Sequence, residues 1–426
     1  MISSFIDTLR NSSLVKSTGI YTITKVINSS IPFLLLPVLT TYLTPSDYGI
    51  VYMITTVIAF VTPFVTLNLD SAVVRRYYYK NENIAQYIGT CSYIIIILCI
   101  LCTIIFYIGG DFFINLTEIP RYVLLFVPFY CFLFFFRNIV LYNWQVRNEP
   151  VYYGLFSIVS TILEITLALI LIVGIGFNWQ GRALSLIVSS FILAIYSVYL
   201  LKKKSMLEMI FVREKAIHAT KYGTGLIPHA IGSSLIVMSN NFFITKMISV
   251  EETGLYGVSA SLASMVSFIT LSFNNAFVPW LFGHLSFKDN GINKKIVRVT
   301  YAYFLLLIGL GFLCFFLIKI IFPFFVNEQF DGSVKYLPWL ILGLVFQGGY
   351  FMMANYILYS EKTYYNGIVT IIIGILSVFL NYVLIWSYGA IGAAIAFSIT
   401  YLLYFILTWL IANKVYPMPW IIFNNT

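Results

Sequence analysis

Apolar runs of roughly 20 residues recur along the whole chain, separated by short polar segments. A helix of about 20 apolar residues is long enough to cross the hydrocarbon core of a bilayer. The pattern therefore predicts an all-α integral membrane protein. Twelve transmembrane helices are expected, at residues 17–43, 48–68, 84–108, 122–144, 150–173, 183–201, 222–247, 254–282, 297–322, 337–358, 367–386 and 390–411.

Composition and charge agree with a multi-pass membrane protein. Hydrophobic residues make up 60% of the chain and charged residues 10%, and the connections between spans are too short for a soluble catalytic domain. Most of the 25 Lys and Arg residues fall on the side of the N-terminus, so the positive-inside rule places both termini in the cytoplasm. Basic loops beside anionic lipid explain the net charge of +9, and no nucleic-acid partner is predicted.

The chain is expected to consist of two similar halves. The longest polar connection, residues 202–221, lies near the middle and is predicted to be a cytoplasmic linker between six-helix bundles at 1–201 and 222–426. Both bundles would begin on the cytoplasmic side, which implies a pseudo-two-fold axis along the membrane normal.

Four pairs of similar segments support this duplication, and they occur in the same order in both halves. They pair residues 25–30 with 229–234, 43–50 with 248–255, 149–153 with 361–365, and 181–183 with 392–394.

The first of these pairs places a basic or titratable residue inside a predicted span of each half. Lys25 lies above Asn28 at helical spacing, and His229 occupies the matching position in the second half. An ionisable group at membrane depth costs about 2.5–3.5 kcal/mol on insertion scales, so a recurring one is expected to line a wet pathway. Two alternatives stay open: Lys25 snorkels to the headgroups, or His229 is a neutral, hydrogen-bonded packing residue.

Other polar residues at or near membrane depth are candidates for the same polar interior. Arg75 follows the second span, and Arg137 lies within the fourth, where an arginine stays charged. Asn240 and Asn274 add amide groups in the second half that could bond sugar hydroxyls or neighbouring helices. For Arg75, a role as a determinant of topology is the alternative.

Glu164 is the lone acid near the middle of its predicted span. It could pair with a nearby base, for which Arg137 is the candidate, or be kept protonated by burial. A protonatable acid in a transporter is a natural coupling site, so Glu164 is a candidate for proton-linked transport.

Motifs for catalysis are absent from the sequence. It contains no His or Cys cluster with metal-ligand spacing and no glycine-rich nucleotide loop followed by lysine. No metal and no cofactor are predicted, apart from H⁺ or Na⁺ as a coupling ion. A membrane-embedded polysaccharide polymerase or acyltransferase is the alternative from the enzyme class, although a polymerase typically has a larger outer loop.

Three segments, residues 31–49, 275–282 and 389–394, resemble the polysaccharide biosynthesis and export family. Within it the chain is similar to the Wzx-type flippases of O-antigen, which belong to the MOP superfamily together with the MATE transporters. The resemblance implies a MATE-like fold. A MATE-like multidrug exporter is the alternative within transport, but such exporters take cations and should favour acidic interiors.

The same resemblance implies the activity, partners and location. Such a flippase moves a polyprenyl-pyrophosphate-linked oligosaccharide repeat unit, of O-antigen or capsule type, from the cytoplasmic to the outer leaflet of the bacterial inner membrane. Its expected partners are this substrate, membrane lipid, a polysaccharide polymerase and a chain-length regulator, and it is expected to act as a monomer. Lys and Arg suit the pyrophosphate, and amides and hydroxyls suit the sugars.

Overall fold

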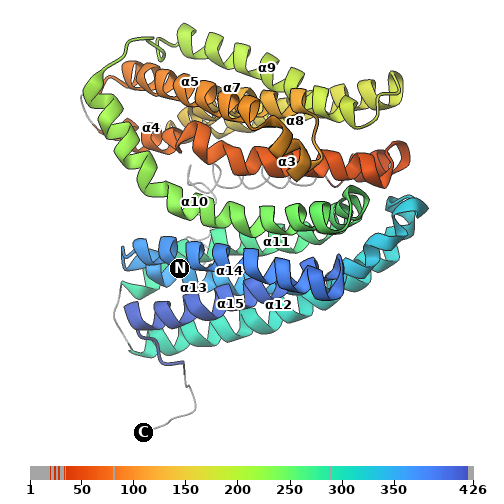
Figure 1. Cartoon of the computed structure of the whole chain (residues 1–426). Coiled ribbons are helices and arrows are strands. Elements are labelled where there is room, and N and C mark those ends of the chain that lie inside the picture. Colours follow the sequence, from red (N-terminus) through yellow and green to blue (C-terminus); the bar gives the residue numbers. More distant parts are fainter. Residues whose placement is uncertain are drawn as a thin grey trace. The chain divides into compact units, whose positions relative to one another are not determined.

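A computed structural model describes residues 20, 24, 27, 28, 33, 35–79, 82–286 and 290–420, without the side chain of Asn290. These residues form helices and connections and contain no strand. The elements (Figure 1) are α3 (Pro45–Thr66), α4 (Leu69–Tyr77), α5 (Ile84–Ile108), α6 (Gly110–Thr117), α7 (Arg121–Val146), α8 (Pro150–Leu169), η1 (Ile170–Gly174), α9 (Trp179–Lys203), α10 (Arg213–Met247), α11 (Val250–Leu285), α12 (Asn290–Phe325), η2 (Glu328–Tyr336), α13 (Leu337–Tyr359), α14 (Tyr364–Tyr388) and α15 (Ile391–Val415).

Ten of the helical segments in the described part are long and apolar enough to span a membrane. They coincide with ten of the twelve predicted spans. Of the other two, the predicted span at 17–43 is only partly described, as residues 20, 24, 27, 28, 33 and 35–43. The predicted span at 222–247 is covered by α10, which is less apolar. A helical, multi-pass membrane protein is therefore confirmed, while the number twelve stays a prediction.

Several helices begin where a polar side chain can bond the first free backbone amides. Asn83 precedes α5 and accepts a hydrogen bond from the Gln86 amide, and Ser249 precedes α11 and accepts one from the Glu252 amide. These caps satisfy donors that have no partner inside the helix. Asn327 does the same for the short η2 helix.

The chain forms two compact units. Among the described residues, unit 1 contains those up to Leu43 together with Ile50–Ile227, and unit 2 contains Thr44–Gly49 and those from Pro228 onward. The domain division at 202–221 stays a prediction.

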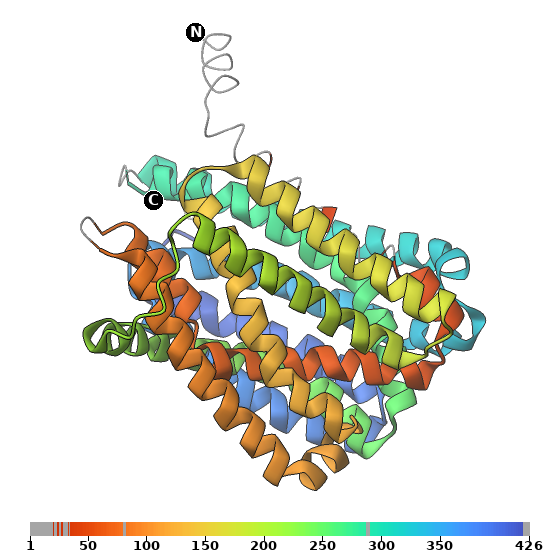
Figure 2. The ribbon, with the colours of Figure 1, turned by 90° about the horizontal axis from the view of Figure 1, so that it is seen from above.

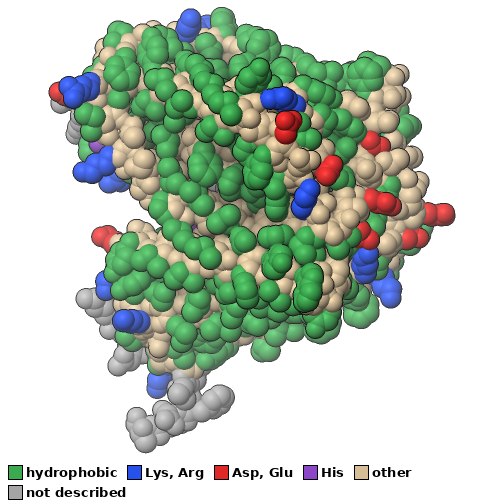
Figure 3. Space-filling model, viewed as in Figure 1, with side chains coloured by type: hydrophobic (Ala, Val, Ile, Leu, Met, Phe, Trp, Pro, Cys, Tyr) green, Lys and Arg blue, Asp and Glu red, His purple; other side chains and the backbone are tan. Residues whose placement is uncertain are grey.

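In unit 1, α7 packs against α5, α8 and α9, and α4 packs against α5 and α7. Figure 2 shows α8, in yellow, beside α9, in yellow-green. Hydrophobic side chains cover most of the face of each unit drawn in Figure 3, as expected where lipid is the solvent.

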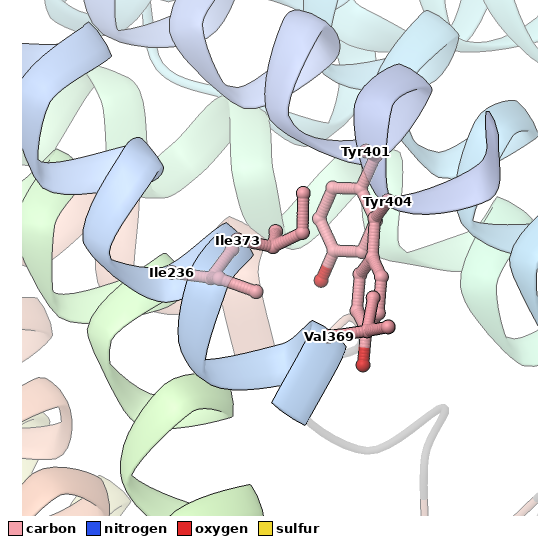
Figure 4. Packing of buried hydrophobic residues seen from close by; sticks show 5 residues of the cluster. All are labelled: Ile236, Val369, Ile373, Tyr401 and Tyr404. Carbon is pink, nitrogen blue, oxygen red and sulfur yellow. The ribbon is translucent and has the colours of Figure 1, made fainter. Parts of the chain in front are cut away.

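In unit 2, α13 packs against α11, α12 and α15, and α14 packs against α15. One buried cluster joins Ile236 of α10, Val369 and Ile373 of α14, and Tyr401 and Tyr404 of α15. Figure 4 shows the two tyrosine rings beside the aliphatic side chains. The cluster is unusual for a hydrophobic core because it contains two phenol hydroxyls, which need hydrogen-bond partners.

Within unit 2, the start of α3 crosses the start of α11 at backbone contact. A Cβ atom on Gly254 would lie 1.9 Å from the Pro45 carbonyl oxygen, and one on Gly49 would lie 2.0 Å from the Val250 carbonyl oxygen. Only glycine permits such an approach. These two glycines belong to the segments that the sequence comparison paired, residues 43–50 and 248–255.

Candidate functional site

Glu164 of α8 forms an ion pair with Arg182 of α9, with 2.7 Å between Oε1 and Nη2. The side chains are 22% and 14% exposed, so the pair is largely shielded. The expectation that Arg137 would be the partner is wrong. The turn that joins η1 to α9 folds the two helices against each other, which brings Arg182 from the start of α9 to the Glu164 carboxylate.

Arg137 of α7 forms no ion pair among the described residues. Its guanidinium lies over the ring of Phe134, 4.8 Å from the centroid, and its Nε is buried without a hydrogen-bond partner in the described part. Tyr130 and Tyr153 lie within electrostatic range of it. Arginine keeps its charge in any environment, and no acid of the described part lies within ion-pair distance of Arg137.

Asn28 is fully engaged between helices. Its Nδ2 donates to the Ser157 hydroxyl and its Oδ1 accepts from the Thr161 hydroxyl at 3.1 Å, both on α8. These bonds join the helix that contains Asn28 to α8. Lys25 lies outside the described residues.

The two arginines at the end of α4 have different surroundings. Arg75 is exposed, and its guanidinium lies 5.9 Å from the ring centroid of Tyr79. Arg76 lies 5.1 Å from the centroid of the same ring, but it is less exposed and also contacts Glu82 at 3.4 Å. Of the two arginines, Arg75 is therefore the more accessible to a ligand.

Arg76 belongs to a cluster, here called the linker clasp, that fastens the chain before and within α10 to unit 1. Glu82 accepts from Arg76 and, at 3.0 Å, from Lys215. His218 Nδ1 accepts from Arg76 Nε at 3.4 Å and lies 2.9 Å from the Tyr87 hydroxyl. Because Arg76 can only donate, His218 is neutral here and carries its proton on Nε2.

The linker clasp is expected to loosen on acidification. Burial and the neighbouring Arg76 lower the pKa of His218 below 6.5, against the opposing effect of Glu82. The folded clasp therefore favours the neutral ring. The stability that the linker clasp contributes is fully present above pH 6.5 and is lost as the pH falls toward the lowered pKa. Protonation then gives the His218 ring a positive charge beside the positive Arg76 guanidinium.

A spin label at position 209, on an exposed linker residue, would measure this in a cysteine-free background. The label should become more mobile between pH 7.5 and 5.5, and His218→Gln should remove the change. Equal pH dependence in both proteins would contradict the assignment.

In unit 2, His229 of α10 begins a chain of hydrogen bonds that links four helices. Its Nδ1 lies 2.9 Å from the Thr370 hydroxyl of α14, which lies 2.6 Å from the Tyr404 hydroxyl of α15. Tyr404 in turn donates to Tyr350 of α13 at 2.9 Å, and their rings stack with centroids 3.9 Å apart. His229 itself is exposed. Its Nε2 has no partner among the described residues and can bond a ligand.

The side chains of the two predicted asparagines of unit 2 differ in their hydrogen bonds. Asn240 is 2% exposed and donates to the Ile236 carbonyl at 3.1 Å, while its Oδ1 has no partner in the described part. Asn274 accepts from Asn355 Nδ2 at 2.8 Å. Asn274 is therefore engaged between α11 and α13.

Sequence reasoning missed three residues that the structure connects to the candidates. They are Arg182, Thr370 and Tyr404. For Arg182, the signal was its position at the start of the helix that follows Glu164. For Thr370 and Tyr404, no spacing in the sequence joins them to His229. No group of three or more His, Cys, Asp or Glu residues in the described part could hold a metal ion.

Comparison of the chain with known proteins identifies its family. Residues 14–284 match the model of the family described as "Polysaccharide biosynthesis protein". An uncharacterized membrane protein of Haemophilus influenzae is 25% identical over 82% of this chain and 85% of its own length. The Lsg locus putative protein 1 of the same organism is 24% identical over 82% of this chain and 85% of its own length.

Solved structures give the fold. The lipid II flippase MurJ in an inward closed conformation superposes with a TM-score of 0.73 at 14% identity, covering 92% of this chain and 86% of that one. A multidrug resistance MATE family transporter of the MOP superfamily, in an inward-facing conformation, gives 0.71 at 14% identity, with 91% and 94% covered. The fold is therefore MATE-like, as the sequence predicted.

Proposed function

Because the chain belongs to the polysaccharide biosynthesis protein family, we propose that it is a flippase for lipid-linked oligosaccharides. It moves polyprenyl-pyrophosphate-linked repeat units of O-antigen or capsule type from the cytoplasmic to the outer leaflet of a bacterial inner membrane. It works as a transporter and changes no covalent bond of its substrate.

The uncompensated charge of Arg137 is the observation that supports this proposal most. A sugar pyrophosphate is too polar to cross hydrocarbon unaided, so its carrier must offer hydrogen bonds and positive charge at membrane depth. Arg137 supplies a cation with an unused buried Nε, and guanidinium groups bind phosphate oxygens in two-point contacts. An exporter of cationic drugs would gain nothing from it.

The other predicted site residues add to this chemistry. Lys25 and Arg75 provide further cations for the pyrophosphate. His229 Nε2 and Asn240 Oδ1, which have no partner among the described residues, provide bonding groups for sugar hydroxyls in unit 2. Asn28 and Asn274 hold neighbouring helices in place for these groups.

We further propose twelve helices in two six-helix bundles, at 1–201 and 222–426, related by a pseudo-two-fold axis along the membrane normal. The backbone contact of Gly49 with the start of α11, and of Gly254 with the start of α3, supports the axis. A two-fold axis interchanges equivalent residues of the two halves, so equivalent segments such as 43–50 and 248–255 can contact each other only close to that axis. Alternating access by rocking of the bundles, with both termini in the cytoplasm, follows from this architecture.

Replacing Lys25, Arg75 and Arg137 together with alanine should abolish translocation while the protein still inserts and folds. In a strain that lacks the wild-type gene, lipid-linked oligosaccharide should then accumulate on the inner leaflet, as it should in the deletion itself. The partner polymerase and chain-length regulator would be deprived of substrate.

A matched control removes three exposed cations, Lys294, Lys295 and Arg298, from the first turns of α12. This variant should translocate normally. Full activity of the first triple variant, or equal loss in both, would refute the proposed site.

A further inference from the structure

The helix that starts at Pro45 is broken at the end of its predicted membrane span, residues 48–68. After α3 ends at Thr66, Leu67 and Asn68 adopt the left-handed conformation, with φ of 48° and 50°, and α4 starts at Leu69. A residue other than glycine in this region costs about 1–3 kcal/mol, and two adjacent ones are seldom found. Such strain persists where the surrounding structure holds it in place.

The break leaves polar groups inside unit 1 without helical partners. The Leu67 carbonyl oxygen points at α10, where it would lie 2.1 Å from a Cβ on Gly223. Asn68 Nδ2 is buried and has no partner among the described residues. A continuous helix would have used the Leu67 carbonyl internally, so the break leaves both this carbonyl and the Asn68 side-chain amide as polar groups inside unit 1.

Asp70 lies in the first turn of α4, directly after the break. Its Oδ1 accepts from the Ser71 amide at 2.9 Å, and its Oδ2 accepts from Asn138 Nδ2 of α7 at 3.5 Å. No cation of the described part lies within ion-pair distance of it. Glu164 differs in this respect, because Arg182 neutralises it.

Other groups around Asp70 do not stabilise its negative charge. Cys91 of α5 and Tyr142 of α7 lie within electrostatic range, and both are neutral. On α4 itself, Arg76 is bound in the linker clasp and Arg75 lies against Tyr79. α4 lies outside the candidate spans, and burial raises the pKa of Asp70 by more than its hydrogen bonds lower it.

We propose that Asp70, held at the α3–α4 break beside Asn138, is a proton-binding site that couples proton movement to transport by this protein. The coupling rests on the function proposed above. A proton from water binds the carboxylate and yields a neutral acid, and its return to water restores the anion. When Asp70 is protonated, its O–H donates and the Asn138 amide turns to accept with Oδ1, so the α4–α7 contact changes with the proton.

The site can be tested without any substrate. Dicyclohexylcarbodiimide reacts with protonated carboxyl groups in apolar surroundings, and mass spectrometry locates the adduct. In the purified full-length protein, Asp70 should be labelled, with labelling that decreases from pH 6 to pH 9 and disappears in Asp70→Asn. Glu164 should stay unlabelled because its carboxylate is bound by Arg182. No adduct on Asp70 at any pH, or stronger labelling of Glu164, would overturn the proposal.

The coupling is tested separately in vesicles with an imposed pH gradient. Translocation of a labelled lipid-linked oligosaccharide should depend on the gradient in the wild type, and this dependence should be lost in Asp70→Asn but kept in Glu164→Gln. Loss in Glu164→Gln alone would refute the assignment. If the wild type translocates nothing, the proposed function fails, while the labelling result still decides whether Asp70 binds a proton.

Discussion

Replacing Gly254 with alanine is expected to remove most of the folded protein from the membrane. The new Cβ atom would lie 1.9 Å from the Pro45 carbonyl oxygen, so α3 and α11 would have to separate. Overpacking against movable side chains costs about 1–3 kcal/mol, and here the obstacle is backbone, so we expect about 3 kcal/mol or more. A fluorescent fusion measured by size-exclusion chromatography in detergent reports the amount of folded protein.

Gly283 provides a control in the same helix. Apart from its chain neighbours and the adjacent backbone of its own helix, no atom of the described part lies within 4 Å of a Cβ at that position. Alanine there should be neutral or stabilising by up to about 1 kcal/mol, because alanine favours the helix over glycine. The two substitutions are chemically identical, so their opposite effects isolate the crossing. Similar yields for both variants would contradict the close contact of the two helix starts.

Glu164→Gln is expected to destabilise the protein through its partner. The substitution leaves the Arg182 guanidinium charged and only 14% exposed, without the carboxylate that lies 2.7 Å away in the wild type. Removing one member of a buried pair costs about 3–5 kcal/mol, and partial exposure places this pair toward the lower end. The melting temperature of the purified protein should fall clearly.

A second substitution identifies which arginine is the partner. Adding Arg182→Gln to Glu164→Gln should recover much of the lost stability, because no uncompensated charge is left. Adding Arg137→Gln instead should recover none. Recovery with Arg137→Gln would restore the pairing expected from the sequence and contradict the observed one.

The spans were predictable because lipid imposes a simple rule on them. α5 has the bounds that its apolar run predicts, and most other ends lie within four residues of prediction, although α10 and α12 start about nine and seven residues earlier than predicted. The break between α3 and α4 was not predictable. Leu67 and Asn68 adopt left-handed angles although neither is glycine, so the cause lies in tertiary packing such as the approach of Leu67 to Gly223.

The sequence was sufficient to predict which residues belong to the candidate site. It was not sufficient to predict which residues bond to each other there. Depth alone singles out Arg137, Glu164 and His229. Their partners depend on how helices turn against each other, which spacing within one helix cannot give. The sequence therefore suggested Arg137 for Glu164, where the structure has Arg182, and it gave no sign of the bond from His229 to Thr370.

The repeated segments were the most informative pattern beyond hydrophobicity. Matching residues 43–50 with 248–255 identified Gly49 and Gly254, which then proved to lie at one crossing in unit 2. Short similar stretches in apolar sequence arise by chance. The match between these two glycines has a physical cause, because at each position a Cβ atom would collide with the facing backbone. Whether the axis extends to the other helices stays a proposal.

The central claim is that this chain moves a lipid-linked oligosaccharide across the membrane without altering it. The most direct test places the purified protein in vesicles that carry a fluorescent polyprenyl-pyrophosphate oligosaccharide in the inner leaflet and follows its accessibility to a membrane-impermeant quencher. We predict that the lipid becomes accessible with unchanged mass, and that it stays inaccessible in the variant with alanine at Lys25, Arg75 and Arg137. Accessibility equal to that of protein-free vesicles, or a product of altered mass, would contradict it.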